Sequence, residues 1–285
     1  MLRRPRIVFC DLDDTFLATD KTLIERNMEM LDELARRGIP FVPCTGRGLN
    51  GVLYHKELAS HPAVRYAITS SGSVVYDMAE RAPIHANVVG HERALELYER
   101  VRDLDATFDV FADGLVYAER FRYERLPGYG IEAPMTAHML RSRTPVDISV
   151  PEIISKAAMV ERIGLYTHMG PEGDAARSRA YDAVASVSDL RWTSAHPAGM
   201  EIVDERCSKG EALTWLCGHL GIDVEDSVGF GDSGNDLEMI EAAGLGVVMA
   251  NGMEEPKRAA DMIAPANDEA GVAVVLGELL GMPTA

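Results

Sequence analysis

Short apolar runs that end in polar clusters recur towards both ends of this chain. The first run, Ile7–Cys10, stops at the acidic stretch Asp11–Thr15, and another, from Ile39 to Cys44, stops at Thr45-Gly46-Arg47. Similar runs lie at Tyr66–Thr69, Val228–Gly231 and Gly246–Ala250. Apolar, β-branched stretches of about four to eight residues with polar boundaries are typical of strands buried on both faces. The pattern therefore predicts a buried sheet whose strands end in polar side chains.

Between these strands, apolar positions at helical spacing predict helices that begin at capping boxes and end at glycines. The expected helices run from the capping box Thr22–Glu25 to Gly38, over about residues 49–58, from the capping box Ser208–Glu211 to Gly221, and from Leu237 to Gly244. Alternation of strands and helices indicates a parallel sheet with helical crossovers. We therefore expect a Rossmann-like α/β domain.

This alternation lapses between about Pro83 and Met200. Polar, arginine-containing segments alternate there with the strand-like runs Leu115–Ala118 and Lys156–Val160, and with helical stretches near residues 92–101 and 175–187. We therefore predict a separate α+β domain at residues 84–201, inserted between two parts of the α/β domain at residues 1–83 and 202–285.

Composition excludes some classes of partner. The 285 residues carry 28 Lys+Arg against 45 Asp+Glu, a net charge of −17, which disfavours nucleic acids and anionic membranes as partners. No apolar stretch approaches the roughly twenty residues needed to span a bilayer, and too few apolar residues follow Arg3, Arg4 and Arg6 for a secretion signal. The four cysteines lack CxxC spacing, so neither a zinc site nor disulfides are indicated. We expect a cytoplasmic protein.

The polar residues at the predicted strand ends have complementary chemistry. They are Asp11, Asp13, Thr45, Ser70, Asp232 and Asp236. Ligands bind beyond the carboxyl ends of strands in an open parallel sheet, so these residues can share one site. Clustered acids repel one another, and a divalent cation would offset the repulsion. Asp11 and Asp232 offer the hard oxygen ligands that suit Mg²⁺, whereas Zn²⁺ would prefer His and Cys.

Other residues near these ends are suited to an anion. Lys209 lies in the first turn of its helix, where the ammonium and the unpaired N–H groups both favour negative charge. Thr45, Gly46 and Asn235 would add a hydroxyl, an N–H and an amide donor. Mg²⁺ with a lysine and several neutral donors is the equipment for phosphoryl transfer. Taken singly, Lys209 equally fits a solvated lysine and Asp232 a helix cap, so only their combination indicates this site.

Four segments stand in order along the chain: Asp11-Leu12-Asp13-Asp14-Thr15, Thr45-Gly46-Arg47, Lys209, and Gly231-Asp232-Ser233-Gly234-Asn235-Asp236. In that order they resemble the four motifs of the haloacid dehalogenase superfamily. The insertion after the third strand is similar to that of Cof-type sugar-phosphate phosphatases, which carry a large α/β cap of the C2B type. The resemblance covers nearly the whole chain, including Ala250-Asn251-Gly252 and Asn267 to Ala273, although for the cap it is architectural.

The resemblance implies a Mg²⁺-dependent phosphatase that acts on small phosphorylated metabolites, with sugar phosphates favoured. Asp11 would be the nucleophile that forms an aspartyl-phosphate, and Asp13 the general acid and then the base. Mg²⁺ would be held by the Asp11 carboxylate, the Asp13 backbone carbonyl and Asp232. Phosphate would be held by Thr45, Gly46, Lys209 and Asn235. Asp236 would orient Lys209 or a water on the metal.

Two residues depart from the resembling motifs, since Asp14 stands where most relatives have glycine and Ser71 where they often have asparagine. Arg47 is expected to hold phosphate or, as we favour, to form a structural pair with surface acids. The alternatives are a phosphomutase or phosphotransferase on the same fold, and a non-catalytic metabolite-binding module, against which the acid pair Asp11 and Asp13 argues.

The cap arginines are either ordinary surface residues or a site for a second anionic group: Arg120, Arg122, Arg125, Arg141 and Arg143.

Overall fold

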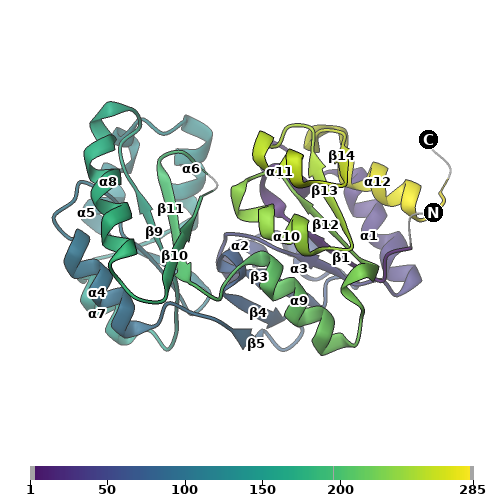
Figure 1. The fold of residues 1–285 in the computed structure, drawn as a ribbon, viewed down its shortest axis with the longest axis horizontal. Helices are drawn as coiled ribbons and strands as arrows, with labels where there is room; N and C mark the ends of the chain where they lie inside the picture. Colours follow the sequence, from purple (N-terminus) through teal and green to yellow (C-terminus); the bar gives the residue numbers. More distant parts are fainter. Residues whose placement is uncertain (1–3, 195, 283–285) are drawn as a thin grey trace. The chain divides into compact units, whose positions relative to one another are not determined.

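The computed structural model describes residues 4–194 and 196–282, and the chain forms two compact units. Unit 1 comprises Met1–Arg47, Val52–His85 and Ser208–Ala285, and unit 2 comprises Gly48–Gly51 and Ala86–Cys207. Figure 1 shows unit 1 in the purple and green-to-yellow ends of the colour scale. The division falls a few residues beyond the predicted boundaries, because β5 (Ala82–Ala86) and β11 (Gly199–Asp204) run across them.

Unit 1 is built on a parallel sheet of five strands in the order β14-β13-β12-β1-β2. Its strands are β1 (Ile7–Cys10), β2 (Phe41–Pro43), β12 (Ser227–Gly231), β13 (Leu245–Met249) and β14 (Met262–Ala264). All four residues of β1 are fully buried, as expected of a central strand covered on both faces. A second sheet of three strands contains β3 (Tyr66–Thr69), β4 (Val74–Asp77) and β5, and a parallel bridge from Cys44 to Ile68 places β3 beside the end of β2.

The helices of unit 1 connect these strands. They are α1 (Glu25–Arg37), α2 (Leu49–Leu53, which begins in unit 2), α3 (Lys56–Ala59), α9 (Lys209–Leu220), α10 (Leu237–Ala242), α11 (Glu254–Ala259) and α12 (Gly271–Leu279). The predicted N-cap of α9 is confirmed, because Ser208 Oγ accepts from the Glu211 N–H at 2.9 Å. The predicted box before α1 is wrong: Ile24 occupies the N-cap, and Thr22 Oγ1 donates to Asp20 instead.

Unit 2 contains a six-stranded sheet in the order β10-β11-β9-β6-β7-β8. Its strands are β6 (Asp109–Ala112), β7 (Leu115–Glu119), β8 (Thr144–Val146), β9 (Val160–Tyr166), β10 (Leu190–Thr193) and β11. Its helices are α4 (His91–Val101), α5 (Arg120–Arg125), α6 (Ala133–Ser142), α7 (Val150–Lys156) and α8 (Pro171–Ala185). The main core joins residues of α4, α7 and α8 to one face of this sheet. The predicted α/β fold with an inserted, sheet-containing α+β domain is therefore confirmed.

Two local predictions differ from the structure. The helix expected over residues 49–58 is two short helices, α2 and α3, with Tyr54 and His55 between them. The strand expected over Lys156–Val160 is displaced, because α7 includes Lys156 and β9 begins only at Val160. Among the described residues, no helix has the length and apolar character needed to cross a bilayer.

Candidate active site

Parallel pairing of three strands brings the first group of acids together. Cys10, the last residue of β1, is in register with Phe230 of β12 and with Pro43 of β2. Asp11 therefore leaves the sheet beside Asp232, which follows β12, and its N–H continues the ladder by donating to Phe230 O at 2.9 Å. The carboxyl-end position predicted for these two aspartates is thus a direct consequence of strand register.

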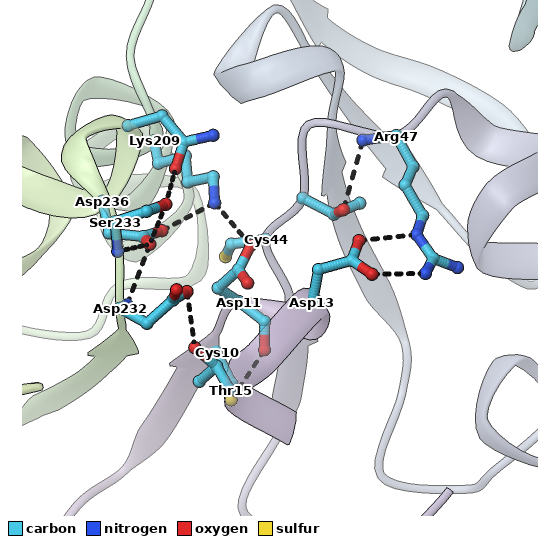
Figure 2. A network of polar contacts seen from close by, with 12 residues as sticks. Cys10, Asp11, Asp13, Thr15, Cys44, Arg47, Lys209, Asp232, Ser233 and Asp236 are labelled. Carbon is cyan, nitrogen blue, oxygen red and sulfur yellow. Dashed lines mark hydrogen bonds and ion pairs between the residues drawn. The ribbon is translucent and has the colours of Figure 1, made fainter. Parts of the chain in front are cut away.

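Lys209 joins two of the acids from the first turn of α9. Its Nζ lies 2.6 Å from Asp11 Oδ1 and 2.6 Å from Asp236 Oδ1, and its side chain is fully buried (Figure 2). Burial alone would lower the pKa of Lys209, but the carboxylates of Asp11 and Asp236 outweigh it and raise the pKa. Lys209 is therefore a fixed cation between two carboxylates.

Asp236 holds the turn that follows β12. Its Oδ2 accepts from the N–H groups of Asp232 and Ser233, both at 3.1 Å, while Oδ1 takes the Lys209 ammonium. Gly231 is needed at the end of β12, because a Cβ there would lie 2.4 Å from the Asp236 Cβ. The side chain of Asp236 therefore ties the β12 turn to the start of α9.

The acids of this cluster fit a divalent cation. One carboxylate oxygen from each of Asp11, Asp232 and Asp236 lies within 4.8 Å of the others. Burial is the largest cause that raises the pKa of Asp11 to about 8, with Asp236 and Asp13 adding to it and Lys209 opposing. Burial, Asp11 and Asp236 likewise raise the pKa of Asp232. Hard oxygens whose charges repel one another are the donor set that Mg²⁺ prefers, so the residues fit this ion.

Asp13 lies beside this cluster but has a different partner. The chain turns through Leu12–Phe16. Arg47 donates to both oxygens of the Asp13 carboxylate, with Nε 2.8 Å from Oδ2 and Nη2 2.6 Å from Oδ1 (Figure 2). Arg47 therefore pairs with an acid, as favoured, but that acid is the candidate catalytic residue Asp13 and not a purely structural partner. Asp14 has φ +60° and pairs with Lys21 at 2.6 Å, and the same Lys21 Nζ lies 3.7 Å from Asp13 Oδ1.

The predicted phosphate-binding residues line the same region. Thr45 is buried, and its Oγ1 accepts from the Arg47 N–H at 3.2 Å, which places Gly46 between two fixed residues. Asn235 is buried in the turn after β12, where its Oδ1 accepts from Ser233 Oγ at 3.0 Å. Figure 2 shows Lys209, Asp11, Asp232 and Asp236 gathered together, with Asp13 and Arg47 beside them.

The segment after β3 holds the backbone of the segment that carries Thr45 and Arg47. Ser70, Ser71 and Gly72 all have positive φ, at +51°, +62° and +100°. The N–H of Ser70 donates to Arg47 O at 2.8 Å, and the N–H of Ser71 donates to Thr45 O at 3.0 Å. Ser70 and Ser71 therefore act on the site through their backbone, by fixing the segment that carries Thr45.

Several residues of the site were not predicted as such. Thr15 Oγ1 donates to Asp232 Oδ1 at 3.0 Å, and Thr15 was singled out only as part of its motif. Asn251, named above only within the Ala250-Asn251-Gly252 segment, donates from Nδ2 to Asp14 O at 2.8 Å and so also holds the turn beside Asp13. His55 contacts Arg47, and Lys21 contacts Asp14. Thr15 and Asn251 have partners more than two hundred residues away, whereas His55 and Lys21 lie eight and seven residues from theirs, at spacings that no local pattern marks.

Four of the five cap arginines singled out from the sequence pair with acids. Arg120 pairs with Asp147, Arg122 with Glu119, Arg125 with Asp105, and Arg143 with Asp109. Arg122 and Arg143 are also buried. The structure therefore favours ordinary structural roles for these four residues over recognition of a second anionic group.

Comparison with known proteins establishes the class. The pattern of the haloacid dehalogenase-like hydrolases matches residues 8–276, so the chain belongs to this family. A solved haloacid dehalogenase-like hydrolase from Bacillus subtilis superimposes with a TM-score of 0.81 at 26% identity, over 96% of this chain and 99% of that one. The family resemblance inferred from the four motifs is thus confirmed.

Among curated proteins, the putative phosphatase YxeH of Bacillus subtilis is 27% identical over 278 residues, covering 96% of this chain and 98% of that protein. A chloroplastic protein of Arabidopsis thaliana named endoribonuclease YBEY is 27% identical over 272 residues, which are 93% of this chain. The match covers only 45% of the Arabidopsis protein, so this chain corresponds to one part of it.

Proposed function

We propose that this protein is a phosphatase that hydrolyses small phosphorylated metabolites, sugar phosphates in particular, with Asp11 as nucleophile and Mg²⁺ as cofactor. Membership of the hydrolase family and the similarity to YxeH support the reaction class. The observation that carries the proposal is the buried contact of Asp11 with Lys209, next to Asp232 and Asp236. All four cysteines are buried free thiols, which supports a reducing, cytoplasmic setting.

In the first half of the proposed reaction, a carboxylate oxygen of Asp11 attacks phosphorus. The Lys209 ammonium keeps its contacts with the carboxylates of Asp11 and Asp236 during this step. The bond from phosphorus to the leaving oxygen breaks, and Asp13 gives that oxygen its proton. Thr45, Gly46, Lys209 and Asn235 bind the phosphoryl oxygens. Mg²⁺, held by Asp11, the Asp13 carbonyl and Asp232, would supply neutralising positive charge.

In the second half, Asp13 takes a proton from water, and the water oxygen attacks phosphorus. The bond from phosphorus to the Asp11 oxygen breaks, which releases phosphate and restores the nucleophile. Asp13 must therefore present its carboxyl group to two different oxygens in turn. Its contact with Arg47 fixes the side chain, and one of the two Arg47 hydrogen bonds must open whenever an Asp13 oxygen carries the proton.

The test is release of phosphate from p-nitrophenyl phosphate by wild type and by Asp11→Asn, with Mg²⁺ and with chelator. We expect Asp11→Asn to lose at least about a thousandfold in kcat. Asp182→Asn, an exposed aspartate on α8, is the matched control and should keep wild-type turnover. Turnover by Asp11→Asn at the wild-type rate would exclude Asp11 as the nucleophile.

A second measurement separates hydrolysis from transfer and from simple binding. Asp13→Asn incubated with p-nitrophenyl phosphate, whose leaving group needs no proton, should accumulate one phosphoryl group on the peptide that contains Asp11, detected by mass spectrometry in mildly acidic digests. With wild type, a panel of sugar phosphates should give free phosphate in equal amount to free sugar. Phosphate that reappears on a second sugar hydroxyl would identify a phosphotransferase or mutase instead.

A further inference from the structure

The guanidinium of Arg47 has a third contact that the proposed reaction does not use. Nε and Nη2 bind the two oxygens of Asp13, and Nη1 lies 3.0 Å from Nε2 of His55. Arg47 and His55 are both buried, with exposed fractions of 9% and 7%. The contacts therefore form a chain that runs from His55 through Arg47 to Asp13.

The donor pattern fixes the state of the histidine. Arginine has donors only, so Nε2 of His55 must be the acceptor and its proton must lie on Nδ1. A neutral ring is consistent with its surroundings, because burial and then the Arg47 charge lower the pKa of His55. The backbone that carries the ring is also held in place. The His55 N–H donates to Val52 O, and the His55 carbonyl accepts from the Ala59 N–H. His55 is thus a rigid neutral acceptor between α2 and α3.

We infer that His55 is a positioning residue that sets the plane of the Arg47 guanidinium and, through it, the plane of the Asp13 carboxylate. The guanidinium is planar, so an acceptor at Nη1 fixes the direction in which Nε and Nη2 point. Without that acceptor, Arg47 can rotate about its terminal bonds to find another partner for a buried donor. Asp13, which is partly exposed, would then lose its defined orientation.

This inference rests on the proposed function, since it gives Asp13 the role of general acid. It predicts a dependence on the leaving group. A nitrophenolate departs without a proton, whereas the alkoxide of a sugar needs one. Damage that acts through Asp13 must therefore reduce kcat/KM for a hexose phosphate and spare p-nitrophenyl phosphate. A merely structural loss would reduce both alike.

The experiment compares His55→Gln, whose side-chain oxygen reaches the place of Nε2, with His55→Asn, whose shorter side chain reaches only the place of Nδ1. We expect His55→Asn to lose about tenfold in kcat/KM for a hexose phosphate and less than about twofold for p-nitrophenyl phosphate. His55→Gln should keep most of both activities. In an Asp13→Asn background, His55→Asn should have no further effect on the hexose phosphate, since both changes act on one group.

Three results would each overturn the role of His55. His55→Asn could lose kcat/KM equally on both substrates, or His55→Gln and His55→Asn could have the same kcat/KM values, or the loss from His55→Asn could add to the loss from Asp13→Asn. A wild type that releases phosphate from neither substrate would overturn the proposed function itself, which is a distinguishable result. Nitrogen NMR of the wild-type ring at pH 8 gives a second readout that does not use activity. It should show Nδ1 protonated and Nε2 bare, with His55→Gln identifying the signals; a protonated Nε2 would overturn the inference.

Discussion

The Lys209 ammonium lies 2.6 Å from the Asp11 carboxylate, although the two residues come from distant parts of the sequence. The contact depends on two local structures that are each well defined. β1 delivers Asp11 at the centre of the parallel sheet, and the Ser208 cap starts α9 so that Lys209 occupies its first position. The same ammonium also binds Asp236 at 2.6 Å. One buried cation therefore supports the nucleophile and the turn after β12 at the same time.

Lys209→Met is expected to lower both stability and activity. Removal of the ammonium leaves the buried carboxylates of Asp11 and Asp236 without their cation, and breaking a buried ion pair in this way typically costs about 3–5 kcal/mol. Urea unfolding in chelator at about pH 9, where Asp11 is ionised, measures this loss. Lys156→Met is the control, because Lys156 is 63% exposed and pairs with Glu152, which is itself 45% exposed. An unfolding free energy equal to that of the control would show that Lys209 is not paired as described.

Local patterns predicted the parts of this structure that depend on neighbours in sequence. The predicted Ser208 cap of α9 formed because Ser208 and the Glu211 N–H lie within one turn of helix. The same spacing at Thr22 and Glu25 failed, since Asp20 accepts from the Thr22 hydroxyl and α1 starts at Glu25 without a side-chain cap. A local competitor thus decided between two identical patterns.

Long-range partners account for what the sequence could not show. β9 was displaced in the prediction because it contains Glu161 and Arg162, charged residues that do not look like a buried strand. Both are buried, and they are accommodated by Gly114, whose N–H donates to Glu161, and by Glu201, which pairs with Arg162. Partners that are distant in sequence thus allow charged residues to lie in a buried strand, which their polarity alone would not predict. The contact of His55 with Arg47 spans only eight residues, but it depends on the break between α2 and α3, where one continuous helix was predicted.

Gly72→Ala is expected to disturb the site through the backbone. Gly72 has φ +100°, and a Cβ there would lie 2.3 Å from the Ser208 carbonyl and 2.7 Å from Lys209 N. Gly38→Ala is the matched control, since Gly38 also has positive φ but would meet nothing within 4 Å. The control should lose only about 1–2 kcal/mol from its left-handed conformation, and Gly72→Ala about 1–3 kcal/mol more together with phosphatase activity. Thermal unfolding and turnover decide this, and equal effects of the two changes would contradict the close approach.

Mg²⁺ should stabilise the protein, and more strongly at pH 8 than at pH 6. Without the ion, burial raises the pKa of Asp11 to about 8, whereas the unfolded residue titrates near about 4. Between these pH values the folded chain holds a proton on Asp11 that the unfolded chain has released. The metal-free protein therefore becomes less stable as pH rises towards 8. Mg²⁺ needs the ionised carboxylate, so its binding becomes more favourable over the same range. The measurement is the rise in Tm on adding Mg²⁺ at each pH.

At a concentration of Mg²⁺ one hundred times its Kd, the expected stabilisation is about 2.7 kcal/mol. Asp232→Asn should remove most of this gain, because Asp232 is a proposed ligand, while Asp182→Asn on the surface of α8 should keep it. A gain that is independent of pH, or that survives in Asp232→Asn, would place the bound ion elsewhere.

Acid should weaken unit 2 through Asp204, which is fully buried at the end of β11. Burial would raise the pKa of Asp204, but hydrogen bonds from Arg206 and Arg93 outweigh it and lower the pKa to about 2. The unfolded residue titrates near about 3.9, so between these values the unfolded chain binds more protons. The stabilisation from Asp204 is therefore complete above pH 4 and is lost as pH falls towards 2.

Asp204→Asn should lower the stability of unit 2 by about 2–3 kcal/mol at pH 6, and this difference from wild type should shrink at pH 3. Trp192, on the neighbouring strand β10, reports the unfolding of unit 2 by fluorescence once the other tryptophan is removed with Trp215→Phe. Asp182→Asn in the same background should show no difference at either pH. If the difference between Asp204→Asn and wild type were equally large at pH 3, the ion pairs of Asp204 would not be its source, because protonation of the carboxylate must weaken them.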